Sequence, residues 1–166
     1  MKHSSIAKLS GAAASLLLLL GPPAAAQTVE QLTGVWQVVS IESITADGKR
    51  SPAFGENPRT QLILTGNGRF SQFFMRSDVP KFASGNRLTG TPEENAAVVK
   101  GANASFGSYT VADKVVTLKM EGSTFPNWIG AEQKRPVVSL TADELVWAVP
   151  AASGGGSIET RWKRVK

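Results

Sequence analysis

The chain has 166 residues, of which 42% are hydrophobic, and its formal net charge is +5 at pH 7. It has no cysteine, and its single histidine is His3. Without these residue types, residues 4–166 exclude a Ser-His-Asp or Cys-His nucleophilic site, the usual zinc sites and thiol redox chemistry. Any catalysis would depend on carboxylates, lysine, arginine, hydroxyl groups or the single tyrosine, Tyr109. We expect no metal and no other cofactor.

The first 26 residues have the pattern of a secretory signal peptide. Lys2 and Lys8 accompany a short apolar run, and residues 24–26 are alanines. A charged start, an apolar stretch and a small-residue end are typical of a cleavable export signal. The stretch is shorter than the ~20 residues of a membrane-spanning helix. We predict cleavage after Ala26, a periplasmic or secreted location, and no stable membrane insertion afterwards. An uncleaved anchor is the alternative.

Residues 27–166 are expected to form a single domain. They carry sixteen basic and thirteen acidic residues, which gives a net charge of +3. Their one basic run, residues 161–164, also fits side chains that alternate across a strand. A charge this small does not indicate nucleic-acid binding, so we expect no nucleic-acid partner. We expect a monomer or a weak oligomer.

Short strand patterns separated by turns occupy most of the remaining sequence. Gly66-Asn67-Gly68 and Asp113-Lys114 are typical of tight hairpins, and Pro136 predicts a bend or bulge. Residues 50–58, with two prolines and a glycine, predict a loop. The eight predicted strands are residues 33–44, 60–65, 69–76, 106–111, 115–120, 132–140, 144–149 and 157–165.

One helix is predicted after the third strand. Thr91 is followed by Pro92 and then Glu94, which form a capping box with proline at the first helical position. The helix should run to about Lys100 and end at Gly101. The other connections are short, which favours an antiparallel up-and-down order. Eight such strands can close into a barrel that holds packed side chains or one small ligand. An open sandwich is the alternative.

Several segments resemble the lipocalin-like domain family of bacteria and fungi. Gly34-Val35-Trp36 opens the first strand, as in lipocalins. The other matching segments are Phe54–Arg59, Phe82–Gly85, Gly90–Glu94, Ser105–Tyr109 and Glu121–Gly130. Together they cover the chain from roughly Leu32 to Val165. The resemblance implies an all-β, eight-stranded antiparallel barrel of lipocalin type, with the one short helix inserted after the third strand. It implies little about activity.

The resemblance also implies structural roles at one end of the barrel. Lipocalins place an arginine of the last strand across the tryptophan of the first strand. This makes Gly34 and Trp36 structural residues and Arg164 the expected partner of Trp36, with Arg161 as the alternative.

One departure from the family pattern concerns the predicted strand 115–120. Family members often have histidine there, in a Thr-His-His-like arrangement. This sequence has Thr117-Leu118-Lys119-Met120 instead. If that histidine acts as an acid, a base or a ligand-binding group in the family, this protein either lacks that role or uses Lys119 in its place.

The candidate ligand site combines apolar strand side chains with polar groups expected near strand ends. The apolar groups would line a cavity or fill a solid core, because pockets and cores are built from the same residue types. Arginine side chains at the mouth would bind an anionic head group or form surface ion pairs. The candidate ligand-binding residues are Phe74, Arg76, Tyr109, Met120, Glu121, Trp128, Gln133, Arg135 and Trp147.

Three functions fit these features, and we favour the first. It is an exported protein that binds a small apolar or amphipathic molecule inside the barrel. One version of this hypothesis has an acidic ligand. The second is a cofactor-independent isomerase or cyclase with Glu42, Lys119, Glu121 or Tyr109 as acid or base. It requires a buried carboxylate or lysine close to Tyr109. The third is a solid-core interaction module with no cavity larger than a water molecule.

Overall fold

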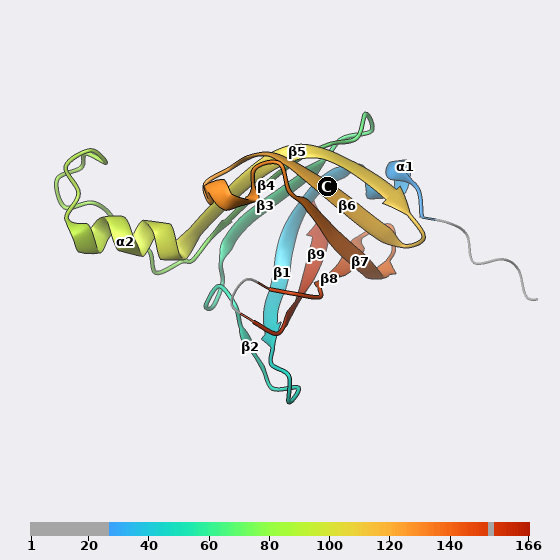
Figure 1. Ribbon diagram of the computed structural model, residues 1–166, viewed down its shortest axis with the longest axis horizontal. Coiled ribbons are helices and arrows are strands. Elements are labelled where there is room, and N and C mark those ends of the chain that lie inside the picture. Colours follow the sequence, from blue (N-terminus) through green and yellow to red (C-terminus); the bar gives the residue numbers. More distant parts are fainter. Residues whose placement is uncertain (1–26, 153–154) are drawn as a thin grey trace, which may run out of the picture.

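The computed structural model describes residues 27–152 and 155–166, so the predicted signal peptide, residues 1–26, lies outside the described residues. Strands make up most of the described chain (Figure 1). They are β1 (Gly34–Ile44), β2 (Arg50–Pro52), β3 (Arg59–Leu64), β4 (Arg69–Met75), β5 (Ala102–Ala112), β6 (Val115–Ser123), β7 (Glu132–Leu140), β8 (Glu144–Val149) and β9 (Ser157–Arg164). The helical segments are α1 (Val29–Leu32), α2 (Pro92–Gly101) and the 3-10 turn η1 (Pro126–Trp128).

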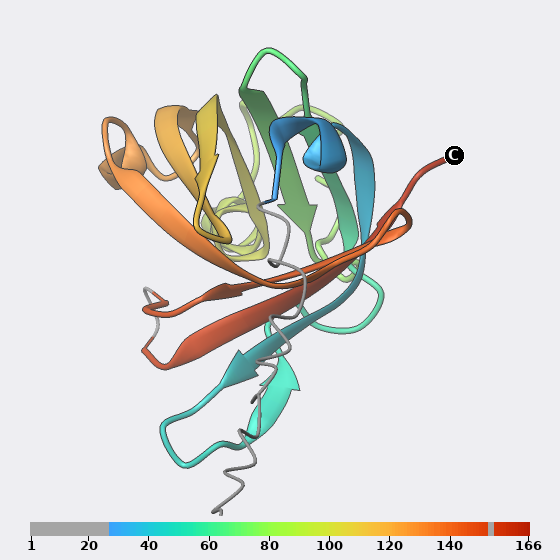
Figure 2. The ribbon, with the colours of Figure 1, turned by 90° about the vertical axis from the view of Figure 1, so that its right-hand side faces the viewer.

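The strands form one closed antiparallel barrel (Figure 2). From β3 to β9 each strand pairs with the next, and β1 pairs with both β3 and β9. The closing ladder runs from Trp36, opposite Arg164, to Ile44, opposite Ser157. The predicted eight-stranded barrel is therefore confirmed, and the open sandwich is excluded. The ninth strand, β2, pairs only with the far end of β1.

The predicted strand boundaries differ from the observed ones in a few places. Residues 50–52 were expected in a loop but form β2. All three side chains are exposed, so the sequence lacks the alternation of apolar and polar residues that indicates a half-buried strand. β5 begins at Ala102, directly after α2, rather than at residue 106. The bulge expected near Pro136 lies between Val137 and Ser139.

The predicted helix is confirmed as α2. The Thr91 hydroxyl accepts a hydrogen bond from the Glu94 backbone N–H at 3.2 Å, and the Glu94 carboxylate accepts one from the Thr91 N–H at 2.9 Å. This capping box satisfies two of the N–H groups that a helix start leaves unpaired. α2 projects away from the barrel on the side where β4 ends and β5 begins (Figure 1).

One end of the barrel is closed by α1 and by Trp36. The Trp36 side chain is fully buried, and its indole N–H donates to the Leu32 carbonyl at 2.9 Å. The guanidinium of Arg164 lies 4.0 Å from the centre of the Trp36 ring. It also donates to the backbone carbonyls of Thr33, Gln31 (2.7 Å) and Ala142. This arginine therefore connects α1, β1, β9 and the turn before β8.

A close backbone approach fixes Gly107 in the wall of the barrel. The β5–β6 register shifts between Phe106 and Gly107. A Cβ at residue 107 would lie only 1.9 Å from the Lys119 carbonyl oxygen. Because the neighbour is backbone and not a flexible side chain, a larger residue requires the two strands to move apart.

We expect Arg164→Met to lower the free energy of unfolding by about 2–4 kcal/mol, because the cation–π contact and the charge-assisted hydrogen bonds are lost together. Urea unfolding followed by tryptophan fluorescence measures the change. The control is Arg69→Met, which removes an exposed ion pair with Glu121 and should cost less than about 1 kcal/mol. Equal losses in both variants would contradict the role of Arg164.

We expect Gly107→Ala to cost about 2 kcal/mol or more, because the methyl group overlaps the backbone of β6. Gly66→Ala is the matched control, since its nearest neighbour is the Thr33 hydroxyl oxygen at 3.7 Å. It should change the free energy of unfolding by less than about 0.5 kcal/mol. Thermal unfolding of both variants gives the comparison, and a Gly107→Ala protein as stable as Gly66→Ala would refute the explanation.

Candidate functional site

A cavity of about 700 Å³ occupies the half of the barrel opposite Trp36. This volume lies within the range typical of small-molecule sites. Its apolar wall includes Ile41, Phe54, Phe74, Trp128, Trp147 and Ile158. Its polar wall includes Gln72, Asn103, Gln133, Arg135 and Thr160. The mouth is bordered by Val99, Lys100, Phe125, Glu132, Lys134 and residues 150–152. The third hypothesis, a solid core, does not fit this interior.

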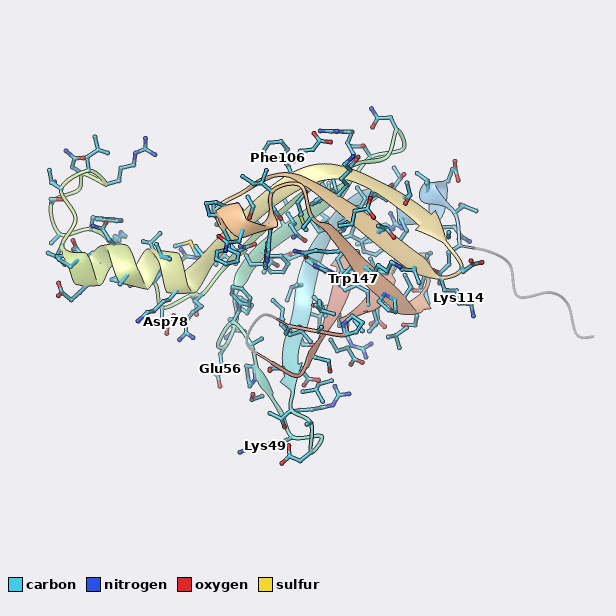
Figure 3. The ribbon with its side chains drawn as sticks, viewed as in Figure 1. Lys49, Glu56, Asp78, Phe106, Lys114 and Trp147 are labelled. Atoms are coloured by element: carbon cyan, nitrogen blue, oxygen red, sulfur yellow. The ribbon has the colours of Figure 1, made fainter. Side chains whose placement is uncertain are left out.

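Aromatic rings determine the shape of the apolar wall. Trp147, 2% exposed, points from β8 into the barrel (Figure 3). Its ring packs edge-on against Trp162 with 5.6 Å between centroids, and Trp162 packs edge-on against Phe74 at 5.5 Å. Phe54 adds a tilted contact to Phe74, also at 5.5 Å. Rings packed in this way have few free rotamers, so the wall is largely formed before any ligand arrives.

Phe125 and Trp128 form a separate aromatic pair at the mouth. The two rings are perpendicular, with centroids 5.6 Å apart. η1 carries Trp128 and holds its ring over the cavity, while Phe125 remains exposed. The pair therefore forms an aromatic surface at the mouth of the cavity.

Arg135 is a charged side chain buried inside this apolar wall. It is 7% exposed and lies at an inward position of β7, between Gln133 and Val137. Its guanidinium donates to the Gln133 side-chain oxygen and to the Lys134 carbonyl at 3.1 Å. Across the β6–β7 ladder its neighbour is Val116. Both hydrogen-bond partners are neutral groups of the protein. They stabilise the positive charge of Arg135 but do not neutralise it.

No carboxylate among residues 27–152 and 155–166 forms an ion pair with Arg135, whereas Arg50, Arg69, Arg76 and Arg161 each have at least one. Burial lowers the pKa of the Arg135 guanidinium to about 10, because a low-polarity environment disfavours the charged form. At neutral pH the group is still protonated. The cavity therefore contains a full positive charge within its wall.

Two further polar side chains of the cavity wall are buried. Gln72 is buried between the inward positions Phe70 and Phe74 of β4, and its amide donates to the Ser105 hydroxyl at 2.8 Å. Thr160 is buried on β9, opposite Trp147. Gln72 and Thr160 therefore add buried polar groups to the cavity wall beside its aromatic rings.

The structure brings five of the nine predicted ligand-binding residues together in the cavity wall. They are Phe74, Trp128, Gln133, Arg135 and Trp147.

Arg76 and Glu121, which were expected at the same mouth, lie elsewhere. Arg76 forms a two-pronged ion pair with Asp78, at 2.6 and 2.8 Å, on the loop that leaves β4. Glu121 forms one with Arg69, at 2.6 and 2.7 Å, on the outer surface of the barrel. Neither side chain contributes to the cavity. Both arginine–carboxylate pairs correspond to the surface ion pairs that the sequence left as the alternative.

Tyr109 and Met120 point inward but do not line the cavity. Tyr109 is buried at the closed end, where its hydroxyl donates to the Thr65 carbonyl at 2.9 Å. Met120 is buried in the hydrophobic core and is not among the residues that line the cavity. Both side chains therefore pack the filled part of the barrel.

Several cavity residues were missed from the sequence. Gln72 and Thr160 share the inward face with Phe74 and Trp162, so strand alternation carries a signal for both of them. Phe54 lies in an irregular loop and reaches the cavity by packing on Phe74, which no periodic pattern indicates. Val99 and residues 150–152 likewise reach the mouth from a helix end and a loop.

The acid or base groups of the enzyme hypothesis do not meet around Tyr109. Glu42 pairs with Arg50 and is 39% exposed in its side chain, and Lys119 is exposed. Glu121 is held by Arg69 on the outer surface. The described part of the chain thus lacks the buried carboxylate or lysine near Tyr109 that this hypothesis requires.

Within residues 27–152 and 155–166, no group of three or more acidic, histidine or cysteine side chains is arranged to hold a metal ion. In the same residues, no helix is long and apolar enough to cross a membrane.

A closed antiparallel barrel with a cavity at one end belongs to the class of lipocalin-like folds, which are compatible with binding a small ligand in the interior. The sequence profile described as a lipocalin-like domain matches residues 33–165. The chain therefore belongs to the lipocalin-like domain family, as its sequence motifs predicted.

One relative has an assigned cargo. The chain is 35% identical over 79 residues to the 4′-hydroxy-3′-methoxypropiophenone carrier protein of Aspergillus oryzae. The match covers 43% of this chain and 70% of the relative.

Solved structures with a similar arrangement share little sequence with this chain. A lipocalin-like protein from Bacteroides uniformis has a TM-score of 0.47 and 14% identity, over 81% of this chain and 99% of that one. Bovine odorant binding protein, in complex with a selenium-containing odorant, has a TM-score of 0.41 and 16% identity, over 88% and 78% respectively.

Because Tyr109 is the only tyrosine, the absorbance of tyrosinate reports on the closed end alone. Burial raises the pKa of the Tyr109 hydroxyl above its ordinary value of 10.0. The unfolded chain then loses this proton first, so the stability that Tyr109 contributes is present below pH 10 and is lost as the pH rises through its folded pKa. We expect an alkaline titration of the folded protein to have its midpoint above 10. In concentrated denaturant the midpoint should return to about 10, and equal midpoints in both states would contradict the burial.

Proposed function

We propose that this protein is an exported carrier of a small amphipathic molecule, which it binds in the open half of the barrel. The observation that carries the proposal is the cavity of about 700 Å³, which is lined by aromatic rings and by a few polar groups. Such a composition suits a ligand with an apolar body and one polar end.

The apolar wall supplies the affinity in this proposal. Burial of apolar surface contributes roughly 25 cal/mol per Å², so a compact aromatic molecule enclosed by Phe74, Trp128 and Trp147 gains several kcal/mol. Because the rings are packed against each other before binding, little side-chain entropy is lost. In this proposal the polar groups of the wall determine the orientation of the ligand, and the apolar groups supply most of the binding free energy.

The fungal relative supports a small aromatic cargo. Its name makes it a carrier of an aromatic ketone that bears a hydroxyl and a methoxy group. A molecule of that size fits a cavity within the usual range for small ligands. The proposed export of the present chain rests on the signal-peptide pattern of residues 1–26.

The proposal is tested by titrating the purified protein with 4′-hydroxy-3′-methoxypropiophenone and with a fluorescent fatty-acid analogue, and by following tryptophan fluorescence. We expect saturable, one-to-one binding of at least one probe, because Trp128 and Trp147 lie in the cavity wall. Lipid and small-molecule extraction of the protein as purified gives an independent readout. Absence of saturable binding and of any extracted ligand would refute the carrier function.

A cavity-filling substitution locates the binding site. Ala102 lines the cavity, and we expect Ala102→Trp to weaken probe binding at least tenfold because the indole occupies ligand volume. Ala112→Trp is the matched control at the other end of β5, where the side chain is exposed and outside the cavity. It should leave the affinity unchanged. Equal affinities of both variants would place the ligand elsewhere.

A further inference from the structure

The buried charge of Arg135 restricts the chemistry of the ligand. The side chain is anchored on β7, one inward position further from the mouth than Gln133. Its hydrogen-bond partners are both neutral, and no ion pair to it exists in the part of the chain that the structure describes. An unpaired buried cation is costly unless a partner with negative charge arrives.

Most of the other charges around the cavity have the same sign as Arg135. The lining residues include three basic side chains, Lys100, Lys134 and Arg135, but only one acidic side chain, Glu132. The two lysines and the glutamate lie exposed at the mouth, and Arg135 alone is buried. The field inside the cavity is therefore positive, which raises the local concentration of anions and disfavours cations.

The geometry of the guanidinium suits one type of anion. Arginine presents a planar set of N–H donors that matches the two oxygens of a carboxylate, and such pairs are stronger than hydrogen bonds between neutral groups. The Gln133 amide and the Thr160 hydroxyl lie in the same cavity wall and offer further polar contacts. The aromatic part of the wall leaves room for an apolar body between Arg135 and the mouth.

We propose that the ligand of this protein is a compact, mainly aromatic carboxylic acid, whose carboxylate is held by Arg135 at the inner wall while its apolar body lies toward Trp128 and the mouth. The proposal rests on the carrier function above and names the ligand class for the same cavity. It places the ionic contact inside the barrel, away from Arg76 and Glu121, which are engaged in ion pairs outside the cavity.

The test compares three probes of the same shape: naphthoate, naphthamide and naphthylmethylammonium. Isothermal titration at neutral pH should give an affinity for naphthoate at least tenfold above that for naphthamide. The carboxylate offers a negative charge and two acceptor oxygens to the guanidinium, whereas the amide offers one neutral oxygen. The ammonium probe should bind more weakly than the amide. Equal affinities for the acid and the amide would overturn the proposal while leaving the carrier function intact.

Substitutions of Arg135 identify the group that recognises the charge. Arg135→Gln should weaken naphthoate at least tenfold and leave naphthamide within about threefold, so that the preference disappears. Arg135→Lys should restore part of it, because the charge is kept but the planar donor pair is lost. Arg161→Gln is the matched control: Arg161 lies on the outer face of β9 and pairs with Glu144. It should keep the full preference for the acid.

Thermal stability separates recognition from a structural role. Saturating naphthoate should raise the midpoint of thermal unfolding of the natural protein and of Arg161→Gln, but not that of Arg135→Gln. If Arg135→Gln loses both probes equally, Arg135 shapes the cavity and the proposal is wrong. If no probe binds to the natural protein, and the ketone and the fatty-acid analogue fail as well, both the ligand class and the carrier function are refuted.

Discussion

Strand β1 pairs with β9 from Trp36 to Ile44, and through this ladder the first and last strands of the barrel become neighbours. Closure removes the exposed strand edges and creates an interior separated from water. The same ladder brings Arg164 over Trp36 and so ties the closed end together. With one end filled by these groups, the only half of the interior left for a ligand is the half where Phe74, Arg135 and Trp147 point inward.

Wall and mouth of the cavity are built by different parts of the chain. The wall comes from inward strand positions, such as Gln72, Arg135 and Thr160, whose places are fixed by the sheet register. The mouth comes from irregular segments: the loop with Phe54, the end of α2, η1 and residues 150–152. Loops tolerate change more readily than paired strands. The separation allows the position of Arg135 to stay fixed while the mouth of the cavity varies in shape.

Sequence patterns predicted the fold further than they predicted the site. The capping box at Thr91 and the turn at residues 66–68 are local signals, and both elements formed as expected. Met120 and Glu121 were both assigned to one ligand site, although adjacent strand residues point to opposite faces, which alternation alone excludes. Arg76 was placed at the mouth, but a loop carboxylate two residues away captures it. The position of the Arg76 side chain depends on the backbone conformation of this loop, and the periodic patterns that predict strands and helices do not predict a loop conformation.

If this protein binds an anionic ligand as proposed, the uncompensated guanidinium of Arg135 would also make the lifetime of the protein depend on that ligand. A ligand that neutralises this charge binds the folded barrel and not the unfolded chain, so occupancy shifts the folding equilibrium by mass action. Proteases cleave opened chains in proportion to how often they open. Vacant molecules would then be degraded before loaded ones, and the amount of carrier would adjust to the supply of what it carries.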